Sequence, residues 1–187
     1  MKKVLATAIL AVLASTAFAD SVSLEGQHVD NTGSNSQTSY ILTYKKDLIA
    51  NKLAADIGFT NTQTEITNAL STRLEAGLTG SANVYGPVGV YTRVAYGEKY
   101  TNTLNYPYYS VEPGVTLAVP GVDGLNVKAG WRYRQAVNLN VVDEDTRTGR
   151  VSVSYNFTKT DAVALGFDRV SGTSTQNIDR LIYTHSF

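Results

Sequence analysis

The stretch LNVKAGWRYR, residues 125–134, alternates apolar or bulky side chains with polar ones along its whole length. One parity carries leucine, valine, alanine, tryptophan and tyrosine, and the other carries Lys128, Arg132 and Arg134. Successive side chains of a β-strand point to opposite faces, so this period of two predicts a strand with one apolar and one charged face. Helical spacing of apolar residues is nearly lacking along the chain, and we therefore expect an all-β protein.

The same alternation recurs in ten segments, which we predict as strands. They span residues 21–30, 38–46, 53–61, 68–79, 87–98, 108–119, 125–136, 147–157, 162–170 and 178–187. Tight turns such as PGVDG and NFTKTD alternate with longer polar connections such as GEKYTNTLNYP. Short turns at one end and longer loops at the other are typical of transmembrane barrels. The pattern predicts a transmembrane antiparallel up-and-down β-barrel of about ten strands.

The first residues have the pattern of a secretory signal peptide. A basic start is followed by an apolar run and by Ala17-Phe18-Ala19 before Asp20. We expect cleavage after Ala19, which leaves 187 − 19 = 168 residues, 20–187, as one barrel domain. Without Lys2 and Lys3 there are 16 − 2 = 14 basic and 16 acidic residues, a balance that does not indicate nucleic-acid binding. The chain has no cysteine, which excludes disulfides and thiolate metal sites, and we expect no cofactor or metal.

Alternation fits a soluble β-sandwich as well as a membrane barrel, because each has one apolar and one polar face. Export favours the barrel, and so do aromatic residues near the strand ends, which suit the two membrane interfaces. On the turn side these aromatic residues are Tyr44, Tyr155, Phe157, Tyr183 and Phe187. On the loop side they are Tyr96, Tyr100, Tyr106, Tyr108 and Tyr109.

The stretch LIYTHSF, residues 181–187, also favours the barrel. Leu181, Tyr183 and Phe187 share one parity, as in the terminal strand that the barrel assembly machinery of Gram-negative bacteria recognises. An even number of strands places both termini in the periplasm. We expect a monomer in the outer membrane that contacts lipid and lipopolysaccharide and is inserted by that machinery.

The charged parity predicts a belt of lumen side chains. If each hairpin folds about the middle of its connection, eight charged residues become consecutive cross-strand neighbours: Asp56, Arg73, Arg93, Glu112, Arg132, Arg150, Asp168 and Arg180. Glu25, Glu75, Lys128 and Arg134 extend the belt. In this scheme Glu112 holds Arg93 and Arg132. Two like-charged pairs then need carboxylates, water or a ligand between them, since opposed like charges destabilise a sheet.

Two interpretations of the belt remain open from the residues alone. Interlocked charges could fill a narrow lumen and hold the barrel rigid. Alternatively, seven basic against five acidic lumen residues could line a water-filled channel that favours anions. The candidate selectivity residues are Arg73, Arg93, Glu112, Lys128, Arg132, Arg134, Arg150, Asp168 and Arg180.

Four stretches carry a resemblance to a known family: VSLEGQHV (22–29), YYSVEPGVTL (108–117), LNVKAGWRYR (125–134) and VSGTSTQNIDRLIYTHSF (170–187). They resemble the small monomeric porins for oligogalacturonate and related acidic oligosaccharides. The resemblance implies an outer-membrane barrel that conducts anionic oligosaccharides, with Arg132, Arg134 and Arg180 as lumen arginines. It also implies twelve strands, the alternative to our ten. A ten-stranded barrel is narrower and favours small anions or monomeric sugars.

Other functions are weaker expectations. His28 and His185, the two histidines, are predicted near opposite ends of the barrel and on the apolar parity, so we expect no catalytic site and no enzyme. Asp143-Glu144-Asp145 could bind Ca²⁺ but is also what a solvated loop contains. The sequence therefore predicts a passive diffusion porin. Its rival is a non-conducting structural or adhesive barrel that acts through its outer loops.

Overall fold

The computed structural model describes residues 21–30, 36–65, 67, 69–138, 145–173 and 175–187. The predicted signal peptide, 1–19, lies outside the described residues, as do Asp143 and Glu144 of the acidic run. The strands are β1 (Ser21–Asp30), β2 (Gln37–Ile49), β3 (Leu53–Thr64), β4 (Leu70–Tyr85), β5 (Val88–Tyr100), β6 (Asn105–Ala118), β7 (Leu125–Ala136), β8 (Thr146–Asn156), β9 (Asp161–Ser171) and β10 (Thr175–Ser186).

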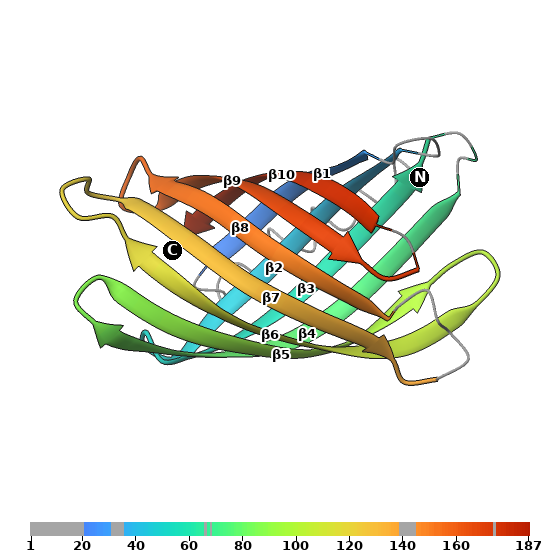
Figure 1. Ribbon diagram of the computed structural model, residues 1–187, viewed down its shortest axis with the longest axis horizontal. Coiled ribbons are helices and arrows are strands. Elements are labelled where there is room, and N and C mark those ends of the chain that lie inside the picture. Colours follow the sequence, from blue (N-terminus) through green and yellow to red (C-terminus); the bar gives the residue numbers. More distant parts are fainter. Residues whose placement is uncertain (1–20, 31–35, 66, 68, 139–144, 174) are drawn as a thin grey trace.

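These strands form a closed barrel (Figure 1). Each strand pairs antiparallel with the next one in the chain, and β1 pairs with β10, so neither of these strands leaves a free sheet edge. The all-β class and the count of ten strands are confirmed, and the twelve-stranded alternative is wrong. Among the described residues there is no helix long and apolar enough to cross a membrane.

The strands are tilted relative to the barrel axis. From Asn83 on β4, the register followed once around the barrel returns to β4 at Ser71, an offset of 83 − 71 = 12 residues. With ordinary strand spacings, this offset over ten strands corresponds to a tilt of roughly 40° and a barrel radius of roughly 10 Å. The lumen is therefore slightly wider than that of an eight-stranded barrel, which side chains alone fill.

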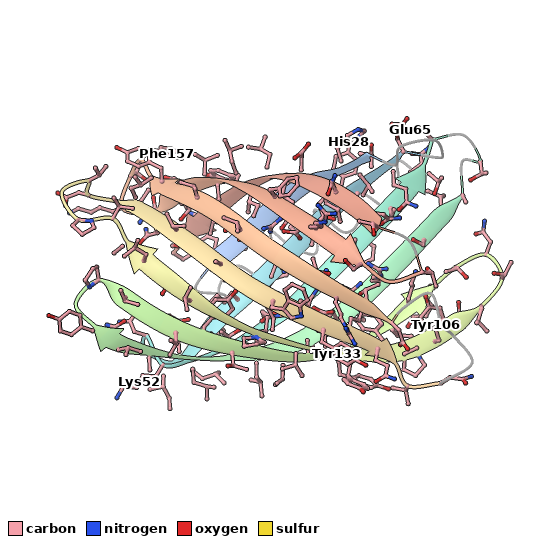
Figure 2. All side chains as sticks on the ribbon, in the orientation of Figure 1. His28, Lys52, Glu65, Tyr106, Tyr133 and Phe157 are labelled. Atoms are coloured by element: carbon pink, nitrogen blue, oxygen red, sulfur yellow. The ribbon has the colours of Figure 1, made fainter. Side chains whose placement is uncertain are left out.

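The two faces of the barrel wall have the polarity of a membrane protein. On β8, Val151 and Val153 point outward and are 49% and 44% exposed, whereas Thr148 and Arg150 take the inward parity. Apolar side chains surround the barrel in the same way on its other strands (Figure 2). Because exposed apolar side chains of this extent are unfavourable in water, the outer surface fits lipid.

The aromatic girdles are confirmed in part. Phe157 at the turn side and Tyr96, Tyr100 and Tyr109 at the loop side are exposed. Tyr106 and Tyr108 were predicted there as well, but they are only 5% and 1% exposed. They share the even parity of Glu112 on β6 and therefore face the lumen.

The connection between β4 and β5 is shorter than the sequence suggested. It consists of Gly86, in the left-handed region at φ 52°, and Pro87. Glycine adopts this φ without a steric penalty, so the chain reverses here and not at the middle of the predicted connection, residues 80–86. The register also shifts between Asn83 and Tyr85. The later turn changes every pairing along this hairpin.

Substitution of Val151 by lysine tests whether the outer face of the barrel contacts lipid. Val151 lies midway along β8 and faces outward, so a lysine there should destabilise the barrel in lipid by about 2–4 kcal/mol. The control is Val122→Lys, at a comparably exposed position in the β6–β7 turn. Urea unfolding in lipid vesicles measures both variants, and equal losses would contradict the lipid-facing assignment.

Candidate functional site: a charged lumen

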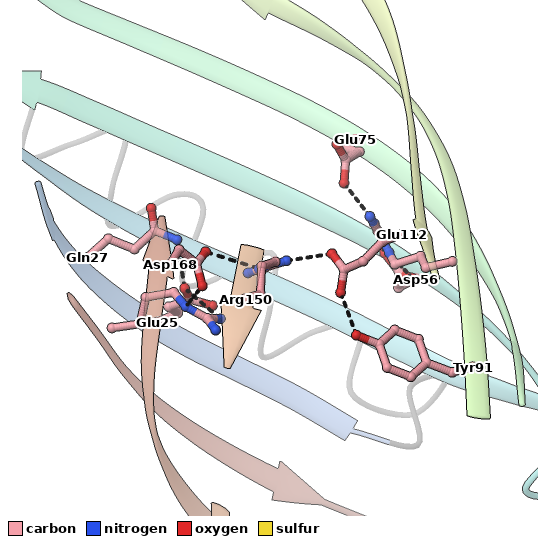
Figure 3. Close-up of polar contacts among 10 residues, drawn as sticks. Glu25, Gln27, Asp56, Glu75, Tyr91, Glu112, Arg150 and Asp168 are labelled. Carbon is pink, nitrogen blue, oxygen red and sulfur yellow. Dashed lines mark hydrogen bonds and ion pairs between the residues drawn. The ribbon is translucent and has the colours of Figure 1, made fainter. Parts of the chain in front are cut away.

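Charged side chains from several strands meet inside the barrel (Figure 3). The first cluster is centred on Arg93 of β5. Its Nε and Nη2 contact the two carboxylate oxygens of Asp56 on β3 at 3.0 and 2.5 Å, and its Nη1 donates to Glu75 on β4 at 2.7 Å. A two-pronged contact of this kind satisfies the guanidinium and fixes its orientation.

The second cluster is centred on Arg150 of β8. Its Nη1 donates to Glu112 on β6 at 2.7 Å, and its Nε donates to Asp168 on β9 at 3.0 Å. The Tyr91 hydroxyl donates to the other Glu112 oxygen at 2.9 Å. Arg180 Nε lies 2.9 Å from Asp168 Oδ1. The Glu112 carboxylate thus interacts with Arg150 and Tyr91, and the Asp168 carboxylate interacts with Arg150 and Arg180.

Arg180 extends the second cluster to β1. Its Nη1 lies 3.7 Å from Glu25 Oε1, and Gln27 Nε2 donates to the same Glu25 oxygen at 2.7 Å. We call the two clusters together the lumen network. It contains Arg93, Arg150, Arg180, Glu25, Asp56, Glu75, Glu112 and Asp168, with Tyr91 and Gln27 as hydrogen-bond donors.

Glycines let the arginines lie flat against the barrel wall. A Cβ on Gly77 would lie 2.6 Å from Arg93 Nη2, and Gly77 is the register partner of Asp56. Arg93 thus reaches across β4 to a carboxylate two strands away. A Cβ on Gly166 would lie 2.6 Å from Arg180 Nη2 in the same way. These contacts explain glycine on the inward parity of strands, where it otherwise weakens a sheet.

The predicted neighbour scheme is only partly right. Arg93 is the register partner of Glu112, and Arg150 is the register partner of Asp168, as expected. Arg132 and Glu112 also lie opposite each other, because the pairs Val111↔Tyr133 and Gly114↔Gly130 bracket them.

Four predicted neighbour pairs are wrong. Asp56 is the register partner of Gly77 and not of Arg73, while Arg73 is the partner of Thr60 and Lys99 and not of Arg93. Arg132 is the partner of Thr148 and not of Arg150. Arg180 is the partner of Gly166, although it still contacts Asp168 along a diagonal. Turn positions taken from midpoints cause these errors. The two predicted like-charged pairs disappear with them, but Arg73 and Lys99 form another like-charged register pair.

The partners of Glu112 also differ from the prediction. Glu112 was expected to hold Arg93 and Arg132, but its ion pair is with Arg150 and its second hydrogen bond is from Tyr91. Long guanidinium side chains reach past the adjacent strand, so the register partner is not necessarily the ion-pair partner. Tyr91 was missed, although it shares the parity of Arg93 two residues away.

Five further inward-facing cations of the described strands lie outside the lumen network and outside the Lys45–Asp47 ion pair of β2: Arg73 on β4, Lys99 on β5, and Lys128, Arg132 and Arg134 on β7. Lys128 Nζ lies 4.0 Å from the centre of the Tyr91 ring, and the Arg134 guanidinium lies 5.0 Å from the Tyr108 ring. Such contacts attract a cation to the ring face without neutralising its charge.

The lumen has room for water at the level of the lumen network. The side chains of Arg93 and Arg150 remain 19% exposed although their guanidinium groups are ion-paired. Asp168, by contrast, is 1% exposed. The described lumen is therefore neither an empty pore nor a dry core at this height.

The histidines lie at different levels, as the sequence predicted. His28 is the register partner of Asp179 and Thr38 near the loop end, and His185 Nδ1 lies 2.8 Å from Asp161 at the turn end. The Asp161 carboxylate also accepts hydrogen bonds from Tyr183, Thr158 and Thr160. This cluster joins the β8–β9 turn to β10, the strand that closes the barrel.

The described residues contain no group of three or more histidine, cysteine, aspartate or glutamate side chains arranged to hold a metal ion. Leu181, Tyr183 and Phe187 are exposed on the outer face. Their role in assembly stays a prediction.

No protein-family model matches the chain, and no curated protein matches it either. Several solved structures share its fold. KdgM porin, solved in complex with disordered oligogalacturonate, superposes with a TM-score of 0.50 at 14% identity, over 88% of this chain and 99% of that one. This chain has a porin-type barrel fold. NanC porin superposes with a TM-score of 0.60 at 9% identity, over 89% and 100% of the two chains.

A third structural neighbour is the COG4313 outer membrane channel from Pseudomonas putida F1. Its TM-score is 0.51 at 11% identity, over 89% of this chain and 94% of that one. At these identities the likeness shows the fold, and function has to be argued from the lumen itself.

Substitution of Gly77 by alanine tests the glycine contact. The new methyl group should displace Arg93 from Asp56 and lower the free energy of unfolding by about 1–3 kcal/mol, since a hydrogen-bonded charge loses its partner. The matched control is Gly80→Ala on the same strand, where a Cβ meets nothing within 4 Å. Urea unfolding of both variants gives the comparison, and equal stability would show that Arg93 does not depend on Gly77.

Proposed function

We propose that this protein is an outer-membrane porin, a passive diffusion channel whose lumen favours small anions or acidic sugars. The outward apolar side chains fit lipid, and the inward charged side chains fit a wet lumen. In this proposal the barrel is a monomer with both termini in the periplasm, inserted by the barrel assembly machinery, and it has no catalytic role.

The distribution of lumen charge carries the proposal. In the lumen network, three arginines face five carboxylates, which gives 3 − 5 = −2. The five cations outside that network add +5, which gives −2 + 5 = +3 for these described residues, and the inward-facing ion pair of Lys45 and Asp47 on β2 adds no net charge. The anionic groups of the lumen network are engaged by arginines, whereas the cationic excess lies on β4, β5 and β7. A solute in the lumen therefore meets a surface whose charge attracts anions.

The structural neighbours support the same class of solute. KdgM porin was solved in complex with oligogalacturonate, an acidic sugar polymer. The lumen network lies along the wall and occupies part of the lumen, which leaves less space than the barrel radius of roughly 10 Å would suggest. We therefore propose passage of small anions or single acidic sugars.

The tight packing of part of the lumen favours a second candidate, a non-conducting barrel that acts through its outer loops. Thr148, Asp168 and Tyr108 are at most 1% exposed, as side chains that plug a narrow barrel would be. Planar-bilayer recording of the refolded protein separates the two candidates, because only the channel gives unitary conductance.

Ion selectivity tests the role of the cations on β7. In a potassium chloride gradient, the reversal potential should show a preference for chloride, and Arg132→Gln should reduce that preference by removing a lumen charge. Arg147→Gln is the control, because Arg147 makes the same charge change from an exposed position on β8. A preference for potassium, or equal effects of the two variants, would contradict the proposed selectivity.

A further inference from the structure

A strip of five side chains runs around the lumen wall on the loop side of the lumen network. Consecutive strands β7, β8, β9, β10 and β1 contribute Arg132, Thr148, Val170, Ile178 and Val29. Arg132 is the register partner of Thr148, Thr148 is the partner of Val170, and Ile178 is the partner of Val29. The strip therefore changes from a cation through a hydroxyl to an apolar surface.

All five side chains face the lumen. Thr148 lies two residues from Arg150, Val170 two residues from Asp168, and Ile178 two residues from Arg180. Residues two apart on a strand share a face, so they point inward with the lumen network. Each lies nearer the loop end of its strand than its network neighbour does.

The polar end of the strip has unused hydrogen-bonding capacity. Thr148 is fully buried, and its hydroxyl has no hydrogen-bond partner. The buried Nε of Arg132 on the neighbouring strand also lacks one. Buried polar groups are nearly always satisfied, so two unsatisfied donors on adjacent strands indicate a missing acceptor. An oxyanion bridging the guanidinium and the hydroxyl would satisfy both.

The other end of the strip is unusual for a porin-type lumen. Val29, Val170 and Ile178 form an apolar cluster and are 4%, 9% and 9% exposed. Lumen-facing positions are normally polar, because they line water or a polar filling. Thr148 and Ile178 are two strands apart and offset by two residues along the strands, a distance of roughly 12 Å along the wall. That length matches a small organic acid with an apolar tail.

We infer that the strip is a binding site for a monocarboxylate with a compact apolar tail, such as an aromatic acid. The carboxylate binds Arg132 and Thr148, and the tail packs against Val170 and Ile178. Arg150, two residues from Thr148 on the same inward face, remains partly exposed, and in this proposal the acid reaches the strip from that side. The inference rests on the proposed channel and specifies its solute class: an amphipathic acid binds here better than a fully polar sugar acid.

Calorimetric titration of the refolded barrel in detergent tests the site without requiring conduction. The ligands are 3-phenylpropanoate, acetate and galacturonate. Burial of the phenyl group should make 3-phenylpropanoate bind at least roughly tenfold more tightly than acetate or galacturonate. Equal affinities, tighter binding of galacturonate or no binding of 3-phenylpropanoate would overturn the inference.

Two variants test the carboxylate-binding end and the apolar end of the site separately. Thr148→Val keeps the shape but removes the hydroxyl, and it should weaken both 3-phenylpropanoate and acetate several-fold. Val170→Thr should weaken 3-phenylpropanoate but not acetate. Val153→Thr, on the outer face of β8, is the control and should change neither affinity. Heat-modifiable gel mobility confirms that each barrel is folded.

The outcomes also separate this inference from the proposed function. Anion-selective conductance without preferential 3-phenylpropanoate binding would overturn the site and leave the channel. Binding with the expected variant effects but no conductance would overturn the channel and leave the site. If Thr148→Val and Val170→Thr behave like Val153→Thr, the strip is not the binding site.

Discussion

The structure depends on the ion pairs that connect nearby strands along the lumen wall. Arg150 joins Glu112 on β6 to Asp168 on β9, and Arg93 joins Asp56 on β3 to Glu75 on β4. Placing a charge inside a protein is costly unless it is paired and hydrogen-bonded. A shift of one residue in the register of any of these strands would turn its charges toward lipid. The lumen network therefore selects one register for much of the barrel.

Because of this constraint, the charged residues of the lumen fall into two groups with different roles. The arginines of the lumen network satisfy carboxylates, whereas Arg132 lies in none of the ion pairs that join the described lumen side chains. Lys128 and Arg134 lie over tyrosine rings, which keep their positive charge while restricting their motion. In the channel that we propose, structural stability and attraction of solutes thus depend on different residues of the same face.

Much of this architecture was predictable from the sequence, because one polarity rule repeats along every strand. The alternation in residues 125–134 identified the strand, its bounds and the inward position of Arg132 and Arg134. The partners of these side chains were not predictable. Midpoints of the connections misplaced the β4–β5 turn, because Gly86 and Pro87 reverse the chain in two residues. Glycines such as Gly77 also let an arginine side chain extend over the adjacent strand to a carboxylate on the strand beyond it. The alternation of polar and apolar residues does not predict such contacts.

A double-mutant cycle on Arg150 and Glu112 tests the lumen network most directly. The free energy of unfolding is measured for the unsubstituted barrel, Arg150→Gln, Glu112→Gln and the double variant. If the two side chains stabilise each other across β7, the two losses are not additive, and the coupling energy lies at about 1–3 kcal/mol. Additivity within about 0.5 kcal/mol would contradict the account, because it would mean that the two charges do not interact inside the barrel.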